Sequence, residues 1–231
     1  MYVYGKNVVN EILKDNTPIK KVFLSDNFSD KDILNKLRSL NINTKYCKTY
    51  ELDKIVDGNH QGIVLEVPDY QYFDIDDLLV NENPLIVILD HLEDPHNFGA
   101  IIRTCEAAGV DGIIIPKNRS VDVNSTVMKT STGALNHVKI CQVTNLKNTM
   151  DYLKKKGFWI VGTDMDGTDY TQVDYKGKMA IITGSEGFGM SRLVKDNCDF
   201  IASIPMYGEV NSLNASVATA IIIYEAIKQR R

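Results

Sequence analysis

The chain has 231 residues, of which 44% are hydrophobic, so it is long enough to form one large domain or two modest ones around a proper core. Its formal net charge is −4, so any contact with nucleic acid must come from a local patch and not from the overall field. No apolar run approaches the roughly 20 residues of a membrane span, and the N-terminal residues do not resemble a signal peptide. The four cysteines are scattered without a Cys-x-x-Cys pair, which argues against a zinc site or a disulfide framework and indicates reduced thiols in the cytoplasm.

The first 67 residues predict a small α/β unit. Apolar residues at helical spacing indicate a helix over residues 6–14. Asp30 is placed to cap a second helix, whose apolar face includes Ile33 and Leu37. Strands are expected at three apolar or β-branched runs, which are residues 21–25, 43–47 and 63–67.

Residues 71–84 are expected to form a linker, because they belong to a stretch rich in aspartate and aromatic residues that contains no glycine. One helical turn is expected within it, near residues 76–79. We therefore predict one domain at residues 1–70 and a second domain at residues 85–231.

The rest of the chain alternates between strand and helix patterns. Strands are expected at residues 85–90, 112–115, 138–143, 158–163, 179–183 and 200–204. Helices are expected at residues 97–108, 124–130, 146–156, 191–195 and 213–229. Near-continuous apolar strands between helices predict an α/β domain with a parallel sheet that is covered on both faces. In the last helix, the 3.6-residue period predicts an apolar face made of Val217, Ala220, Ile221, Tyr224 and Ile227.

Three polar loops follow predicted strands in the second part of the chain. Residues 94–99 lead into a helix that carries Arg103, and residues 184–189 contain three glycines that let a backbone approach a ligand closely. Residues 204–216 lead into the last helix, whose N-terminus favours an anionic group. In open α/β sheets, ligands bind at the carboxyl ends of strands. The alternative for the last loop is an ordinary strand-to-helix connection with Asn and Ser caps.

Two common nucleotide motifs are absent from the glycine-rich loop. Residues 184–189 lack the Gly-x-Gly-x-x-Gly spacing of a dinucleotide fingerprint and the Lys-Ser/Thr pair of a P-loop. Nicotinamide cofactors and ATP are therefore unsupported. No cluster of metal-binding residue types is visible in the sequence either.

Together, the three loops resemble the three motifs of the SpoU/TrmH branch of the SPOUT methyltransferases. The first motif is Asp-Pro-His-Asn at 94–97 with Arg103, the second is Gly-Ser-Glu-Gly at 184–187, and the third runs from Ile204 to Ser216. All three occur in order on a matching strand pattern, and the resemblance covers about two-thirds of the chain.

The resemblance implies a fold that periodicity cannot give. Members of this family have a deep trefoil knot at the C-terminus, and the loops of the second and third motifs would form it around the methyl donor. The family is generally homodimeric. Residues 4–7 and 60–63 also resemble segments of the small RNA-binding domain joined to many members, which is similar to ribosomal proteins of the L30e type.

The reaction implied by the resemblance is methyl transfer from S-adenosylmethionine to a ribose 2′-hydroxyl in RNA, without a metal ion. Within the family, the chain is most similar to the enzymes that methylate a guanosine in 23S rRNA. Transfer to tRNA is the alternative substrate. A protein of a different class, an inactive methyltransferase fold that binds RNA or assists ribosome assembly, is a further alternative.

The resemblance assigns a catalytic group made of Arg103, Asn97, Glu186, Ser212 and Asn214. Arg103 matches the family's catalytic arginine, although arginine holds its proton too tightly to be a good base. The N–H donors of its planar guanidinium are better suited to stabilising a developing alkoxide and holding a phosphate. Four of these five residues also have a structural alternative: a surface salt bridge to Glu106 for Arg103, a helix cap for Asn97 or Asn214, and bracing of its own loop for Glu186.

Donor binding is assigned by the same resemblance to Gly184, Ile204, Met206 and Leu213, mostly through backbone groups and packing. Ser212 is an additional candidate for this role. The alternative for Ile204 and Leu213 is plain core packing.

Overall fold

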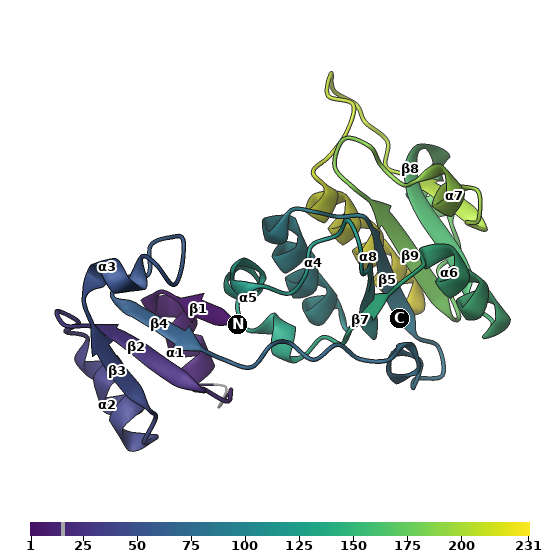
Figure 1. Ribbon diagram of the computed structural model, residues 1–231. Coiled ribbons are helices and arrows are strands. Elements are labelled where there is room, and N and C mark those ends of the chain that lie inside the picture. The colour runs from purple at the N-terminus through teal and green to yellow at the C-terminus, as the bar shows by residue number, and fades with distance from the viewer. Residues whose placement is uncertain (15–16) are drawn as a thin grey trace. The chain divides into compact units, whose positions relative to one another are not determined.

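A computed structural model describes residues 1–14 and 17–231 of the chain. The described residues form two compact units (Figure 1). The first unit contains Met1–Gln71 together with Val123–Gly133, and the second contains Tyr72–Asp122 together with Ala134–Arg231. Among the described residues, no helix has both the length and the apolar character required to cross a membrane.

The first unit is built on a four-stranded sheet with the order β1-β4-β2-β3. Its strands are β1 (Tyr2–Tyr4), β2 (Lys21–Ser25), β3 (Thr44–Cys47) and β4 (Ile63–Glu66). Its helices are α1 (Lys6–Lys14), α2 (Lys31–Ser39), α3 (Thr49–Leu52) and α5 (Ser125–Ser131). Strand β4 runs antiparallel to both β1 and β2, whereas β2 and β3 are parallel. Asp30 caps α2 as predicted, because its carboxylate accepts a hydrogen bond from the Ile33 backbone N–H.

One segment of the first unit comes from far along the chain. Helix α5 lies within Val123–Gly133, and its Met128 packs against the apolar core that α1 and the sheet enclose. The linear order of domains predicted from the sequence does not include this return of the chain. The chain returns because this segment packs against residues that are distant in sequence. The local pattern of apolar residues does not reveal such packing.

The second unit is a six-stranded, entirely parallel sheet with the order β10-β8-β9-β5-β6-β7. Its strands are β5 (Leu85–Asp90), β6 (Gly112–Pro116), β7 (Ile140–Val143), β8 (Trp159–Asp169), β9 (Met179–Gly184) and β10 (Phe200–Ser203). Its helices are α4 (Pro95–Ala108), α6 (Leu146–Lys155), α7 (Arg192–Lys195) and α8 (Ala215–Arg230), with short 3₁₀ turns at Ile75–Leu78, Ala134–Asn136 and Tyr170–Gln172. The predicted parallel α/β class is confirmed.

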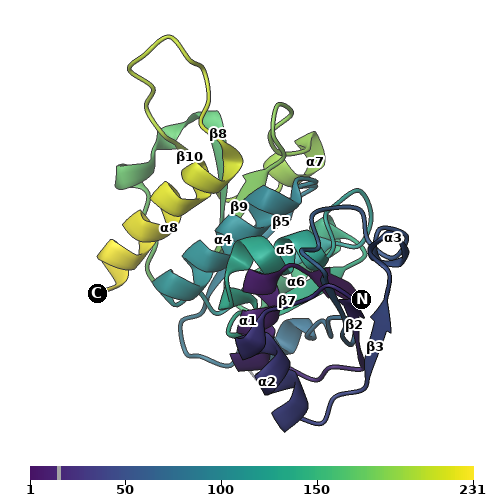
Figure 2. The same cartoon turned by 90° about the vertical axis from the view of Figure 1, so that its left-hand side faces the viewer.

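Helices cover the two faces of this sheet in pairs. Helices α4 and α8 pack side by side on one face, and α6 and α7 contact each other on the other (Figures 1 and 2). Alternate strand residues point to opposite faces, so Ile86 and Ile88 join the core that includes Met150 and Leu153 of α6. On the opposite face, the hydroxyl of Thr219 in α8 is buried 3.0 Å from that of Thr183 in β9.

The buried face of α8 differs from the one that spacing predicts. The buried residues are Ala215, Thr219, Ile222, Ile223 and Ala226. Val217 and Tyr224, which belong to the predicted apolar face, are 47% and 52% exposed. Apolar residues occur on both faces of this helix, so periodicity alone does not identify the one that packs on the sheet. The second apolar face of α8 is partly exposed, because Val217 and Tyr224 are exposed while Ala220, Ile221 and Ile227 are half-buried.

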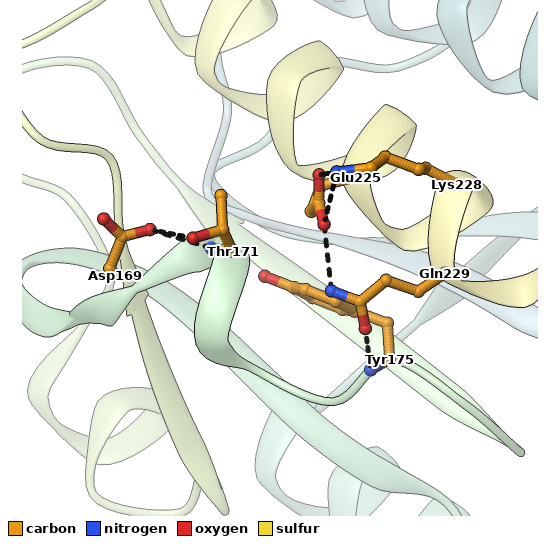
Figure 3. Close-up of polar contacts among 6 residues, drawn as sticks. All are labelled: Asp169, Thr171, Tyr175, Glu225, Lys228 and Gln229. Carbon is orange, nitrogen blue, oxygen red and sulfur yellow. Dashed lines mark hydrogen bonds and ion pairs between the residues drawn. The ribbon is translucent and has the colours of Figure 1, made fainter.

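The C-terminal half of α8 is held to the segment that follows β8 (Figure 3). The Gln229 side chain accepts a hydrogen bond from the Tyr175 backbone N–H at 3.3 Å and donates one to Glu225 at 3.0 Å. Lys228 pairs with the same carboxylate at 3.1 Å. The Tyr175 ring is fully buried, and its hydroxyl has no hydrogen-bond partner among the described residues. Burial is the first cause that raises the pKa of Tyr175, with the charge of Glu225 adding to it.

Candidate active site

The three motif loops lie at the carboxyl ends of three strands of one sheet, in which β9 and β5 are neighbours and β8 separates β9 from β10. One follows β5, one follows β9 and one follows β10. The loop after β9 folds back on itself, because Ser185 and Gly189 exchange two backbone hydrogen bonds of 2.9 and 3.0 Å. Gly187 and Gly189 have φ angles of 79° and 66°, a left-handed conformation that glycine adopts without strain. The longer loop between β10 and α8 extends beyond the sheet (Figure 2).

A small network of side chains joins all three loops. Asn97 donates hydrogen bonds from its amide nitrogen to Asp94 and to Glu186. Asn214 donates from its amide nitrogen to Asn97 Oδ1 and to Glu186 Oε1, both at 3.0 Å. Its own Oδ1 caps α8 by accepting from Ser216 N at 2.9 Å. Capping and site assembly are therefore combined in Asn214, and Glu186 joins the other two loops to its own.

The start of helix α4 corrects one expectation. Asp94, and not Asn97, is the N-cap, because its carboxylate accepts a hydrogen bond from His96 N at 3.0 Å. Pro95 follows at the first helical position, where its fixed φ suits a helix start. Asn97 lies inside the first turn and is buried, so its amide is free to bind the other loops.

A cavity of about 640 Å³ opens between the ends of β8, β9 and β10. It is lined by all four residues assigned to donor binding, which are Gly184, Ile204, Met206 and Leu213. Three residues assigned to the catalytic group also line it, which are Glu186, Ser212 and Asn214. Asn97 and Arg103 are not among its lining residues.

Sequence reasoning missed part of this lining. Thr163, Asp164 and Met165 form one wall, and Phe188 forms part of another. The rule that ligands sit at the carboxyl ends of strands would have indicated the first group, since the strand was expected to end at Thr163. Strand β8 instead continues to Asp169.

Gly184 permits a close backbone contact within the protein, whereas the sequence predicted only the close approach of a ligand. A Cβ atom at this position would overlap the carbonyl carbon of Gly189 and the nitrogen of Met190. The glycine therefore lets the loop after β9 fold against its own strand. That folding in turn shapes the wall of the cavity.

The charges around the cavity favour a cationic ligand. Among the described residues that line it, Asp164 and Glu186 are the only ionisable ones, and both are acidic. Burial alone would raise the pKa of Asp164, but its 2.9 Å contact with Lys195 and a backbone hydrogen bond from Asp166 hold that pKa below its usual value. The carboxylate of Asp164 therefore stays charged at neutral pH.

Arg103 lies on the exposed side of α4. Within the described part of the chain it forms no ion pair, so the expected alternative, a salt bridge to Glu106, is not present. A guanidinium without a partner remains available to a ligand or to another chain. Among the described residues, no group of His, Cys, Asp and Glu could hold a metal ion.

Known proteins show the same combination of loops and units. The sequence profile of the SpoU rRNA Methylase family matches residues 84–224, and the profile named RNA 2′-O ribose methyltransferase substrate binding matches residues 2–73. The putative TrmH family tRNA/rRNA methyltransferase YacO of Bacillus subtilis is 43% identical over 238 residues, which cover 99% of this chain and 96% of YacO.

Solved structures agree with this result. The SpoU methyltransferase AviRb of Streptomyces viridochromogenes, crystallised with AdoMet, matches with a TM-score of 0.84 and 25% identity, covering 99% of this chain and 89% of AviRb. An AdoMet-bound rRNA methyltransferase from Sinorhizobium meliloti matches with a TM-score of 0.77 and 25% identity, covering 98% and 86%. The chain therefore belongs to the SpoU/TrmH family of RNA methyltransferases, which use S-adenosylmethionine as the methyl donor.

Proposed function

We propose that this protein methylates a ribose 2′-hydroxyl in RNA, and that a guanosine of 23S rRNA is its substrate. The observation that carries the proposal is the network of Asn97, Glu186 and Asn214. It fixes three motif loops around a cavity large enough for a nucleoside-sized donor.

The cavity of about 640 Å³ suits S-adenosylmethionine in charge as well as in size. The donor carries a sulfonium and an ammonium group, and the cavity presents the carboxylates of Asp164 and Glu186. Gly184 and Leu213 would hold it through backbone groups and packing, with Ile204, Met206 and Ser212 completing the apolar and polar walls. When bound, S-adenosylmethionine supplies an activated methyl group, so the chain's task is to place and polarise the acceptor.

Arg103 is the residue to which we assign charge stabilisation at the acceptor oxygen. Its guanidinium presents a fork of N–H donors, which suits a developing alkoxide and an adjacent phosphate. Since it is exposed and lies outside the lining of the single chain's cavity, a partner subunit or bound RNA would complete the site.

A homodimer is part of this proposal. The second apolar face of α8, with Val217 and Tyr224 exposed, is the surface that we assign to the contact with a second copy of the chain. The knot that the family resemblance implies would place the loops after β9 and β10 together, where the Asn214–Glu186 hydrogen bond joins them.

The remaining assignments concern the substrate and the cell. Residues 1–70 are proposed as the RNA-binding domain and residues 85–231 as the methyltransferase domain, with the linker at 71–84. We assign the protein to the cytoplasm, where RNA and S-adenosylmethionine are both present. The tRNA alternative is supported by the name of YacO, which includes both RNA classes.

The test is transfer of labelled methyl groups from S-adenosylmethionine to separate pools of 23S rRNA, 16S rRNA and tRNA, all taken from cells that lack the gene. Label in 23S rRNA supports the leading substrate. Label in tRNA alone keeps the reaction and replaces the substrate. A protein that binds neither the donor nor RNA contradicts the proposal, whereas RNA binding without donor binding favours the inactive, ribosome-assembly alternative.

A further inference from the structure

A second cavity lies on the other side of the loop that follows β9. It has a volume of about 630 Å³ and opens at the carboxyl ends of β9, β5 and β6. Four residues line both this cavity and the donor cavity, and they are Ser185, Glu186, Phe188 and Gly189. The loop after β9 therefore lies between the two cavities. Glu186, a member of the hydrogen-bond network, lines both of them.

The loops that form the far side of this second cavity are held together. The Val121 backbone N–H donates to the Leu92 carbonyl at 2.8 Å, and the Ser120 hydroxyl donates to the same oxygen at 3.2 Å. These bonds place Arg119, which follows β6, beside His91, which follows β5. Both have positive φ angles, of 53° and 57°. Such conformations are strained for residues with a side chain, and they cluster at functional sites.

A buried carboxylate fixes the floor of the cavity. Asp90 is 1% exposed, and its two oxygens bind the His91 ring at 2.5 Å and the Ser191 backbone N–H at 2.6 Å. Both carboxylate oxygens of Asp90 therefore already have hydrogen-bond partners within the protein. The ring of His91 is held at the rim, where it remains partly exposed.

Charge and aromatic surface make this cavity different from the first. Arg119 is the only permanently charged cation among its lining residues, and within the described residues it forms no ion pair. Phe188 is 91% exposed, so the face of its ring is accessible to a ligand. An exposed ring and a free guanidinium are the groups with which proteins hold unstacked nucleotides of single-stranded RNA.

We propose that the second cavity holds the acceptor nucleotide, with Phe188 stacking on its base and Arg119 binding a phosphate beside it. This inference rests on the proposed RNA methyltransferase function. The loop after β9 borders both cavities, so a base held in the second cavity leaves its ribose to reach past that loop toward the donor. Glu93 and Asp94 also line the cavity. Their carboxylates repel phosphate, which makes the single cation at Arg119 more important for RNA capture.

The experiment compares Arg119→Ala and Phe188→Ala with the wild-type full-length chain, using an in-vitro-transcribed substrate RNA. RNA affinity is measured at several salt concentrations, donor affinity by calorimetry, and transfer by incorporation of labelled methyl groups. Phe188→Trp is the conservative variant that keeps a stacking surface. Lys155→Ala is the control for loss of a surface cation, because Lys155 is exposed at the C-terminal end of α6 and lines neither cavity.

We expect Arg119→Ala to raise the KM for RNA roughly tenfold and to lower the salt dependence of log K by about 0.7, the value of one single-strand phosphate contact. Phe188→Ala should weaken RNA binding by about tenfold, within the range for loss of one stacked base, without changing the salt slope. Phe188→Trp should restore binding. Lys155→Ala should leave RNA affinity unchanged, and Arg119→Ala should leave donor affinity unchanged.

The outcomes separate this inference from the function on which it rests. Wild-type transfer with unchanged RNA affinity in both alanine variants overturns the acceptor cavity and leaves the methyltransferase proposal standing. An equal loss in Lys155→Ala also overturns it, because the effect would then be one of general charge. Absence of transfer by the wild-type chain to any RNA pool overturns both.

Discussion

The amide nitrogen of Asn214 donates a hydrogen bond to the side-chain oxygen of Asn97 at 3.0 Å, although 117 positions separate the two residues. One belongs to the first turn of α4, and the other caps α8. Both also bind Glu186 in the loop after β9. The start of two packed helices and the wall of the donor cavity are thus fixed by the same three side chains.

Asn214→Ala should reduce both stability and donor binding. Loss of the cap removes the acceptor of the Ser216 and Val217 N–H groups and should lower the free energy of unfolding by about 1 kcal/mol. Loss of the two bonds to Asn97 and Glu186 should in addition loosen the cavity wall. Thermal unfolding and calorimetric titration with S-adenosylmethionine measure the two effects separately.

Asn145→Ala is the matched control for this variant. Asn145 caps α6 by accepting a hydrogen bond from Asn148 N at 2.9 Å, and it does not line the donor cavity. It should show a similar loss of stability with donor affinity unchanged. Equal donor affinity in both variants would refute the role of Asn214 in the network.

Gly184→Ala should abolish donor binding. The added methyl group would overlap the backbone at Gly189 and Met190, which are main-chain atoms and cannot rotate away as the end of a side chain would. The loop after β9 must then move and the cavity loses its wall. Gly208→Ala is the control, because a Cβ there meets no atom within 4 Å. A Gly184→Ala protein that binds the donor normally would show that the folded-back loop is not required.

Asp164 gives the protein a pH dependence on the acid side. Its folded-state pKa is lower than the ordinary value of 3.8, so its pair with Lys195 contributes stability above that value and loses it as the pH falls through the lower folded pKa. Asp164→Asn should therefore flatten the acid limb of a plot of melting temperature against pH. It should also weaken donor binding roughly tenfold, since one interaction with a charged group is worth about 1.5 kcal/mol.

Lys195→Gln separates the two roles of that pair. It breaks the same 2.9 Å contact but leaves the Asp164 carboxylate in the cavity wall. Stability at neutral pH should fall as in Asp164→Asn, whereas donor affinity should be retained. If both variants lose donor affinity equally, the carboxylate acts only through the loop structure and not on the ligand.

Tyr175→Phe should stabilise the protein. The hydroxyl of Tyr175 is buried without a partner in the described chain, and an unsatisfied buried polar group costs about 1–3 kcal/mol. Its removal should raise the free energy of unfolding by about 1 kcal/mol in urea denaturation. Tyr152→Phe provides the comparison, since the Tyr152 hydroxyl donates to Asp76 at 2.5 Å and its loss should not stabilise. A destabilised Tyr175→Phe protein would show that the hydroxyl has a partner in solution.

Many strands of the second unit could be predicted from the sequence, because buried parallel strands consist of continuous apolar runs. Strands β5, β6 and β9 lie where those runs predict them. Strand β1 and helix α3 were missed, since three and four residues are too few to show a period. The period of α8 identifies an apolar face but not the face that packs on the sheet, because both of its faces are apolar and only the position of the sheet distinguishes them.

The residues of the candidate site were likewise predicted only in part. Residues within the three loops, such as Gly184 and Leu213, were named from the motif resemblance, and they line the cavity that we propose for the donor. Asp164 and Arg119 were missed, because each belongs to a strand end or loop outside the motifs. Their place in the site depends on strand order in the sheet, which alternation of strands and helices does not determine.

The central claim is transfer of a methyl group to a ribose 2′-hydroxyl, and the most direct measurement locates the methyl group within the RNA. Wild-type protein and Arg103→Ala are incubated with labelled S-adenosylmethionine and 23S rRNA, and the RNA is then cleaved with alkali. Because a 2′-O-methyl group blocks cleavage of its own phosphodiester, we expect label in a single alkali-resistant dinucleotide. Arg103→Ala should bind the donor normally and lose transfer by about a hundredfold or more, as expected when a transition-state donor is removed. Label in alkali-sensitive nucleotides, which would place the methyl group on a base, would contradict the account.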